Sequence, residues 1–434
     1  MKLSERDKKI IWHPFTQQKT AKLPIAIKKA KGSYLYDENN KAYLDLISSW
    51  WVNMHGHTHP KIAEAIYQQS LCLEHVIFAG FTHEPAIKLC EDLQKLLPNK
   101  LSKFFFSDNG STSVEVAIKM AYQYWWNQGY TEKTIFLSFE GGYHGDTFGA
   151  MSVGATSAFH APFTKLFFSI LTIPFADTWH QDYLVQEKEA LALNILKNHL
   201  INNAAKIAAL ILEPLVQGAS GMRMCRPKFI NDVVDLVRSY GVLIIFDEIM
   251  TGFYRTGSCF AFEQTTIIPD FLCISKGLTG GFLPLALTIT SEQIYEMFLS
   301  DSFSHSFAHG HSYTANPLSC SAAIASLQLF NNTNTLNAIN NIIIAQQRAI
   351  LNLLFLQENI NKIQKIRTCG TILAFDININ NYENNIMEIL KYKFIEQGLL
   401  IRPLGNTIYV LPPYCIQIRE LEESYKTIIS IICN

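Results

Sequence analysis

The chain has 434 residues, of which 48% are hydrophobic and 17% are charged. This share of apolar residues can form a large core, so the sequence is not that of an intrinsically disordered protein. Lys and Arg together number 36 against 37 Asp and Glu, a balance that argues against a general electrostatic affinity for nucleic acid or for an acidic membrane.

The most apolar stretches are too short to span a membrane. Residues 207–216 and 242–250 fall well below the roughly 20 apolar residues that a bilayer requires, and they contain Glu213, Asp247 and Glu248. The first ten residues are charged throughout and have no apolar signal core. The nine cysteines include no C-x-x-C pair, which indicates reduced thiols. We therefore expect a cytoplasmic protein without a membrane or nucleic-acid partner.

Strand-like and helix-like segments alternate through the middle of the chain. Residues 113–126 have apolar side chains at helical spacing, and residues 229–239 show the same periodicity. Apolar runs separated by helices indicate a parallel sheet that helices cover on both faces, so the sequence predicts an α/β fold. The β-prone or fully apolar runs lie at residues 134–139, 207–212, 242–246, 271–274 and 285–289.

The last hundred residues have a different pattern. A helix is expected within residues 335–356, and short strands are expected near residues 367–375 and 399–411. This change of pattern predicts a second, smaller unit. The expected regions are residues 1–55, which pack with the small domain, residues 56–328, the large domain, and residues 329–434, the small domain.

Two predicted strand ends carry the residues best suited to chemistry. Asp247 and Lys276 each follow an apolar strand, and ligands of open α/β sheets bind outside the carboxyl ends of the strands. Burial lowers the pKa of a lysine and leaves the neutral amine that Schiff-base chemistry needs. A carboxylate about 4 Å from a ring nitrogen contributes roughly 4 kcal/mol at an effective dielectric near 20, which keeps a pyridinium protonated. From these two residues alone, a structural ion pair is the alternative.

The loop before the helix at residues 113–126 has the features of a phosphate site. It contains Gly110, which permits close backbone approach, and Ser111, which offers a hydroxyl and an amide. A helix N-terminus also favours an anion. An ordinary N-cap with turn residues is the alternative. The loop matches neither G-x-x-x-x-G-K-[ST] nor G-x-G-x-x-G, which argues against nucleotide sites of those kinds.

A second glycine-containing turn, residues 141–146, follows the strand at residues 134–139. Its two glycines place Tyr143 at the edge of the sheet, where the ring can stack on a planar cofactor, although a plain turn with a half-buried tyrosine is the alternative. The histidines at residues 55–59 and 305–311 lack the spacing of a metal site, so we expect no metal.

These segments together resemble the class III (subgroup II) aminotransferases, which are fold-type I enzymes that depend on pyridoxal 5′-phosphate (PLP). Residues 243–257, LIIFDEIMTGFYRTG, resemble the family's strand with the aspartate that binds the pyridine nitrogen. Residues 269–277, PDFLCISKG, resemble its cofactor-lysine segment. The resemblance implies a large domain with a mostly parallel seven-stranded sheet and a smaller α+β domain built from both termini.

Further segments resemble the branch of this class that makes 7,8-diaminopelargonate for biotin. The resemblance implies ping-pong transfer of an amino group to 7-keto-8-aminopelargonate. S-adenosylmethionine is the expected donor, but lysine stays open because Phe15 and Leu404 stand where some members have Tyr and Phe. The segments are IWHPFT at residues 11–16, SSWW at 48–51, EPLVQG at 213–218, MRM at 222–224, GHSYTANP at 310–317 and IRPLG at 401–405.

The resemblance assigns roles around the cofactor. Lys276 is implied to hold PLP as a Schiff base and then to move a proton, while Asp247 binds the pyridinium nitrogen. Tyr143 is implied to stack on the ring, and Gly110 and Ser111 are implied to bind the phosphate within the same subunit.

The resemblance also implies a homodimer with a shared site and a set of substrate-binding residues. Ser312, with its neighbour His311, is implied to reach the cofactor of the other subunit. Trp50 and Trp51 are implied to wall an apolar channel for the long substrate, and Arg402 to bind its terminal carboxylate by a bidentate pair that lysine would not reproduce. The other residues placed on the substrate side are Phe15, Tyr143, Asp146, Arg255 and Gly310.

Two rival functions remain open from the sequence. The first is another class III PLP enzyme, such as an ω-amino acid aminotransferase, a decarboxylase or an aminomutase, which would share Asp247 and Lys276. Transamination of a long keto acid is favoured over this rival by Trp50, Trp51 and Arg402. A catalytically inactive protein with a PLP-enzyme fold is the other rival, and the retention of the cofactor residues together argues against it.

Overall fold

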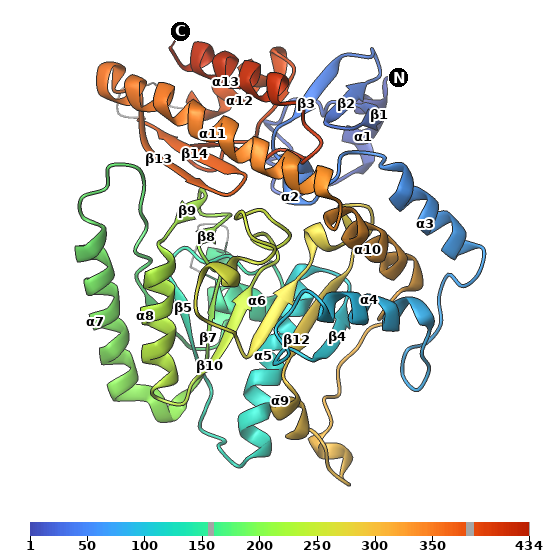
Figure 1. Ribbon diagram of the computed structural model, residues 1–434, viewed down its shortest axis with the longest axis vertical. Helices are drawn as coiled ribbons and strands as arrows, with labels where there is room; N and C mark the ends of the chain where they lie inside the picture. Colours follow the sequence, from blue (N-terminus) through green and yellow to red (C-terminus); the bar gives the residue numbers. More distant parts are fainter. Residues whose placement is uncertain (155–159, 379–385, 434) are drawn as a thin grey trace.

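The computed structural model describes residues 1–154, 160–378 and 386–433. A seven-stranded sheet forms the centre of the molecule (Figure 1). The strand order is β4-β12-β11-β10-β7-β5-β6, and neighbours from β11 to β6 pair in parallel. Only β12 runs antiparallel to its neighbours β11 and β4, so the sheet is mostly parallel and the predicted α/β fold is confirmed. The strands are β4 (Lys103–Ser107), β5 (Ile135–Phe139), β6 (Ile170–Ile173), β7 (Ile207–Leu212), β10 (Leu243–Asp247), β11 (Phe271–Ile274) and β12 (Ala286–Thr290).

Helices cover both faces of this sheet, which is why its central strands read as unbroken apolar runs. On one face, Ile211 and Ile245 pack in the same core cluster as α5 (Gly110–Asn127). On the other face, Leu210 and Ile244 pack with α8 (Pro227–Arg238), and α7 (Val185–Asn203) lies beside α8 (Figure 1). All six residues of β7 are buried. The carboxyl ends of the strands are therefore the places where polar side chains can meet a ligand.

The N-terminal and C-terminal segments of the chain share a second region, seen at the top of Figure 1. Strand β15 from near the C-terminus pairs in parallel with β3, so the two ends of the sequence meet in one four-stranded sheet, β1-β2-β3-β15. The boundaries at residues 55 and 328 stay a prediction. The elements of this region are β1 (Ile27–Lys31), β2 (Tyr34–Asp37), β3 (Ala42–Asp45), α11 (Thr333–Ile360), β13 (Ile363–Cys369), β14 (Ile372–Ile377), α12 (Ile386–Glu396), β15 (Leu399–Leu400), β16 (Thr407–Val410) and α13 (Ile418–Cys433).

Among the described residues, one helix is long and apolar enough to cross a membrane by length and composition alone, the segment Thr333–Glu358 of α11. This helix packs against β13 and α13. Its residues Ile339, Ile342 and Leu353 are buried in the main core cluster. A helix that supplies core residues in this way has an apolar composition for a reason other than a bilayer.

Helix α5 begins at Gly110, three residues before the start expected from apolar periodicity. The reason is its N-cap, because the Asn109 side chain accepts a hydrogen bond from the Thr112 amide at 3.1 Å. Gly110 and Ser111 therefore form the first turn of the helix. The remaining elements are α1 (Leu3–Ile10), α2 (Ser48–Trp51), α3 (Pro60–Ser70), α4 (Glu84–Gln94), α6 (Phe148–Val153), β8 (Val216–Gln217), β9 (Arg223–Met224), α9 (Glu292–Glu296) and α10 (Pro317–Phe330).

Candidate active site

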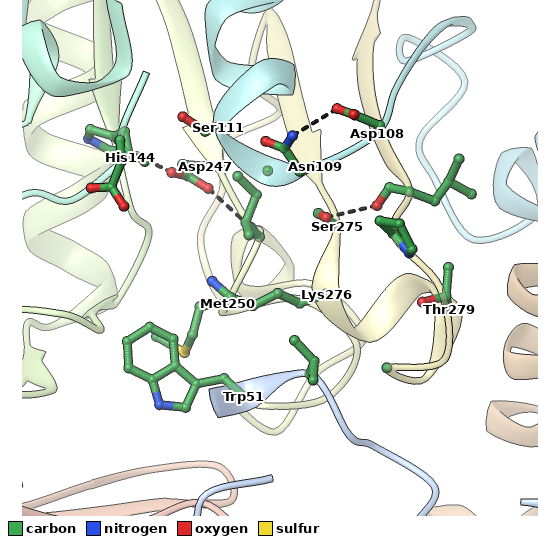
Figure 2. Close-up of a pocket in the computed structure, with 18 of the residues that line it drawn as sticks. Trp51, Asp108, Asn109, Ser111, His144, Asp247, Met250, Ser275, Lys276 and Thr279 are labelled. Atoms are coloured by element: carbon green, nitrogen blue, oxygen red, sulfur yellow. Dashed lines mark hydrogen bonds and ion pairs between the residues drawn. The ribbon is translucent and has the colours of Figure 1, made fainter. Parts of the chain in front are cut away.

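A cavity of about 670 Å³ lies at the carboxyl ends of the central strands (Figure 2). Asp247, at the end of β10, and Lys276, just after β11, both line it, and Trp51 closes it from the N-terminal region. The first turn of α5 also lines it, together with the turn that follows β5. The structure thus brings together residues that are separated by more than 200 positions in the sequence.

The Lys276 side chain faces the cavity with an altered affinity for protons. Burial lowers the pKa of its amine, while the carboxylates of Asp247 and Glu213 oppose that shift. The amine nitrogen lies 5.0 Å from the centre of the Trp51 ring. Lys276 also has a φ of +41°, in the sparsely populated left-handed region. The lowered pKa favours the neutral amine, which is the form that attacks a carbonyl carbon.

Asp247 is held by a buried histidine that the sequence reasoning missed. His144 Nδ1 donates to Asp247 Oδ2 at 2.7 Å, and Asp247 Oδ1 accepts from the Ile249 amide at 3.1 Å. The two side chains are almost completely buried, and His144 Nε2 has no hydrogen-bond partner among the residues that the structure describes. His144 lies in the turn after β5, at the same edge of the sheet as Asp247. Its position after a predicted strand was the available signal.

The N-terminus of α5 forms the other end of the cavity. Ser111 Oγ accepts from the Thr147 amide at 3.0 Å and lies 2.8 Å from Thr147 Oγ1. A Cβ at Gly110 would come within 2.9 Å of Ile249, and a Cβ at Gly145, which has a φ of +123°, would lie 2.2 Å from Ser111 Oγ. Only glycine fits both places. The result is a bare backbone at a helix N-terminus, which suits a phosphate.

Glu115 connects the site at the N-terminus of α5 to the next helix, α6, through hydrogen bonds. The sequence did not predict this role of Glu115. Its carboxylate accepts a short hydrogen bond from the Thr147 hydroxyl. It also accepts from the amides of Gly149, at 2.7 Å, and Ala150, at 3.0 Å, in the first turn of α6. Glu115 thus fixes Thr147, which in turn contacts Ser111.

Tyr143 lies between two acidic side chains. Its hydroxyl donates to Asp146 Oδ2 at 3.0 Å, and its amide donates to Glu213 Oε1 at 3.1 Å. Glu213 accepts a second amide hydrogen bond, from Gly218 at 3.0 Å, and burial raises its pKa to about 7. Glu213 lines the cavity beside Tyr143, Asp146 and Lys276. In the sequence, Glu213 stands out only as a charge in the apolar run 207–216 and as the first residue of the segment EPLVQG, and neither signal predicts this role.

The two tryptophans face different surroundings. Trp51 is buried and lines the cavity, and its Nε1 donates to the hydroxyl of Tyr409 at 3.0 Å. Trp50 does not line the cavity; its ring lies 4.7 Å from the Arg402 guanidinium and 5.6 Å from the Phe15 ring. Phe15, Trp50 and Arg402 therefore form one cluster outside the cavity. Trp50 links this cluster to Trp51, the next residue in the chain, which lines the cavity.

The structure leaves some expected site residues outside this cavity. Arg255 is fully buried and donates to the carbonyl oxygens of Pro412 at 2.8 Å and Asn53 at 3.2 Å, so its guanidinium is used to join backbone segments. The segment with Gly310, His311 and Ser312 also does not line the cavity of its own chain, and Ser312 is exposed.

These features define a class of protein: an enzyme that holds PLP. The cavity has an amine with a lowered pKa for the aldehyde, a buried carboxylate for the ring nitrogen, a tyrosine for the ring face and a glycine-lined helix N-terminus for the phosphate. The residues therefore fit this cofactor. When bound, PLP supplies an aldehyde carbon for amines and a ring that withdraws electrons.

The chain belongs to the class III aminotransferases, because the model of that family, Aminotransferase class-III, matches residues 15–432. It is therefore a PLP-dependent transaminase that acts on small molecules. A relative from Synechococcus elongatus, named adenosylmethionine-8-amino-7-oxononanoate aminotransferase, is 49% identical over 97% of this chain and 98% of its own length. A relative of the same name from Helicobacter pylori is 39% identical over 99% and 97% of the two chains.

A solved structure supports the same assignment. The crystal structure of adenosylmethionine-8-amino-7-oxononanoate aminotransferase from Methanocaldococcus jannaschii matches with a TM-score of 0.91 and 34% identity. The match covers 99% of this chain and 98% of that one. The expected fold, PLP fold type I, and the expected cofactor are thereby confirmed.

Proposed function

We propose that this enzyme transfers an amino group from S-adenosylmethionine to 8-amino-7-oxononanoate, which is 7-keto-8-aminopelargonate, to give 7,8-diaminopelargonate for biotin. The name shared by the relatives from Synechococcus elongatus and Helicobacter pylori, at 49% and 39% identity over nearly the full chain, supports this reaction. The geometric observation that carries it is the Lys276 amine in one cavity with Asp247 and beneath the apolar face of Trp51. This arrangement combines a transamination centre with a wall for a long chain.

The cofactor residues act as follows. Lys276 Nζ, whose pKa burial lowers, would hold the cofactor and would take up and return the substrate proton. Asp247 would keep a proton on the ring nitrogen, and His144 holds Asp247 in place through the 2.7 Å hydrogen bond. Tyr143 would cover one face of the ring. Gly110 and Ser111 would bind the phosphate at the N-terminus of α5.

The substrate residues exclude water and orient the long acceptor. Trp51 covers the space beside Lys276, and Trp50 with Phe15 extends the apolar surface toward Arg402. Arg402 binds the carboxylate at the far end of the acceptor. Asp146 orients Tyr143 through its hydroxyl.

The site is completed by a second copy of the chain. Ser312, with His311 and Gly310, contributes to the cofactor and substrate site of the partner in a homodimer. Support comes from the position of this segment, which is outside the cavity of its own chain, with Ser312 exposed. We place the enzyme in the cytoplasm, since the nine cysteines are all free, as in a reducing compartment.

Separate half-reactions test the proposed function. The PLP-loaded protein is mixed with S-adenosylmethionine, lysine or another amino donor alone, and conversion of the cofactor to its amine form is followed by absorbance. We expect S-adenosylmethionine to produce the amine form and 8-amino-7-oxononanoate alone to reverse it, with release of the diamine. If lysine converts the cofactor and S-adenosylmethionine does not, lysine is the amino donor. A converted cofactor that 8-amino-7-oxononanoate does not reverse would indicate a different class III enzyme.

A further inference from the structure

The backbone that presents the two tryptophans is a left-handed turn. Ser48, Ser49, Trp50 and Trp51 have φ values of +49°, +45°, +69° and +74°. L-residues other than glycine rarely adopt this conformation even singly, because the Cβ crowds the following carbonyl. Four such residues in succession persist only where the surroundings hold them, and conformations of this kind concentrate at ligand sites.

Asp45 is the main residue that holds this turn from within its own segment. It is completely buried. Its Oδ1 accepts from the amides of Ile47 at 3.3 Å and Ser49 at 3.0 Å, and its Oδ2 accepts from the Ser49 hydroxyl at 2.7 Å. A buried carboxylate that accepts several hydrogen bonds is strongly tied to its donors. Asp45 therefore fixes the first half of the left-handed turn.

His57 also donates to Asp45, and its protonation can be deduced from its neighbours. The Gly56 amide donates to Asn53 Oδ1 at 2.8 Å, so the Asn53 amide group presents Nδ2 to His57 Nδ1, 3.0 Å away. His57 Nδ1 must accept that hydrogen, which leaves the hydrogen of the neutral ring on Nε2. His57 Nε2 then donates to Asp45 Oδ2 at 2.9 Å. The amides of Ile47 and Ser49 and His57 Nε2 can only donate in this arrangement, on both oxygens of Asp45, so a carboxylate satisfies all of them at once.

The C-terminal region holds the other end of the turn. The Ser48 hydroxyl donates to the Leu411 carbonyl at 2.8 Å, and Trp51 Nε1 donates to the Tyr409 hydroxyl at 3.0 Å. With both ends fixed, Trp51 lies beside Lys276 and Trp50 lies against Arg402. The turn thus sets the spacing between the reacting end and the carboxylate end of the acceptor site.

We propose that Asp45 is a positioning residue for acceptor selectivity, which acts by holding the left-handed turn that aims Trp50 and Trp51 at the two ends of a long, carboxylate-bearing acceptor. This inference rests on the proposed function for the identity of the acceptor. It adds a residue that touches neither the cofactor cavity nor Arg402: Asp45 is not among the residues that line the cavity.

The test is the Asp45→Asn variant of the PLP-loaded enzyme. The new amide places an N–H group opposite His57 Nε2, which donates and needs an acceptor, and it removes the charge that the Ser49 hydroxyl binds. We expect KM for 8-amino-7-oxononanoate to rise about tenfold, the effect of one lost charge-assisted hydrogen bond. The expected change in kcat is less than threefold, and the expected change in the dissociation constant of PLP is less than twofold. A KM within twofold of the wild-type value would overturn the proposal.

Asp37→Asn is the matched control. Asp37 accepts from the amides of Asn39 at 2.9 Å and Lys41 at 2.8 Å and from the Tyr43 hydroxyl at 3.2 Å, so it holds an ordinary turn in the same sheet. We expect its KM to match that of the wild type. An increase as large as that of Asp45→Asn would show a general effect of loosening the N-terminal sheet and would contradict the specific role.

A double-mutant cycle separates positioning from folding. If Asp45 acts through the tryptophans, Asp45→Asn in a Trp51→Ala background should change KM less than twofold, and full additivity would refute the mechanism. If Asp45→Asn does not fold, Ser49→Ala is the second variant, because it removes only the hydrogen bond from the Ser49 hydroxyl to the carboxylate. Its KM should rise about threefold, and an unchanged KM would overturn the proposal. A wild type inactive on 8-amino-7-oxononanoate would contradict the proposed function alone. The same variants would then be compared with 9-oxononanoate, a long aldehyde that keeps the terminal carboxylate, and an unchanged KM of Asp45→Asn for it would overturn the role of Asp45.

Discussion

Replacement of His144 tests how the enzyme keeps the cofactor ring protonated. His144→Leu removes the hydrogen bond of 2.7 Å to Asp247 and leaves that carboxylate with the hydrogen bond from the Ile249 amide at 3.1 Å. Both side chains are at most 4% exposed, so water cannot easily replace the lost donor. A hydrogen bond to a charged group contributes about 1.5–3 kcal/mol, and the loss should therefore lower kcat roughly tenfold to hundredfold.

The assay compares this variant with His144→Asn, whose shorter side chain keeps an N–H group near the position of Nδ1. We expect His144→Asn to recover a large part of kcat and His144→Leu to recover none, while the phosphate end of the cavity, and hence the affinity for inorganic phosphate, stays unchanged in both. Equal rates in the two variants, or a His144→Leu rate within threefold of wild type, would refute the reasoning that the hydrogen bond to Asp247 is what matters.

Two other predictions follow from the cavity. Burial raises the pKa of Glu213 from 4.5 to about 7, so between these pH values the folded state binds a proton that the unfolded state does not. The free energy of unfolding should therefore fall by roughly 2–4 kcal/mol as pH rises from 4.5 to 7. Urea titrations of Glu213→Gln should lack this part of the pH dependence. Gly145→Ala would place a Cβ 2.2 Å from Ser111 Oγ, so the dissociation constant of this variant for PLP should rise more than tenfold. Gly129 also has a positive φ, but a Cβ there would meet no atom within 4 Å, so Gly129→Ala should bind PLP as the wild type does. Equal affinities in the two variants would contradict the phosphate site.

The residues at the centre of the site could be predicted because their signals are local. Asp247 and Lys276 each interrupt an apolar run at the point where a buried strand ends, and the topology of a parallel sheet brings such ends to one edge. Gly110 and Ser111 likewise stand just before the segment with clear apolar periodicity, residues 113–126, and form the first turn of its helix. Neither pair needed knowledge of long-range contacts.

The residues that hold these groups could not be predicted in the same way. Glu115 lies within α5, where a glutamate is an ordinary helix former, and its role depends on Thr147 and α6, more than 30 positions away. For Arg255 the family segment predicts a substrate residue, whereas the structure shows its guanidinium on the carbonyl oxygens of Asn53 and Pro412, contacts that no local signal predicts. Partners of this kind are decided by tertiary packing.

The turn at residues 48–51 shows why the wall of the site is the hardest part to derive. Ser-Ser-Trp-Trp contains no glycine or asparagine to announce a left-handed backbone, and at about 1–2 kcal/mol per residue the isolated segment would not adopt one. The cost is offset by the hydrogen bonds of Asp45 and by Tyr409 and Leu411, which come from a strand region some 360 positions later. Local preference and the final structure disagree here, as they do at strained functional sites, and the proposed role of the tryptophans as the wall of the acceptor site accounts for the disagreement. If that role holds, acceptor selectivity depends on the association of the N-terminal and C-terminal segments, and a change that loosens β3 from β15 should raise KM for the acceptor before it weakens the binding of the cofactor.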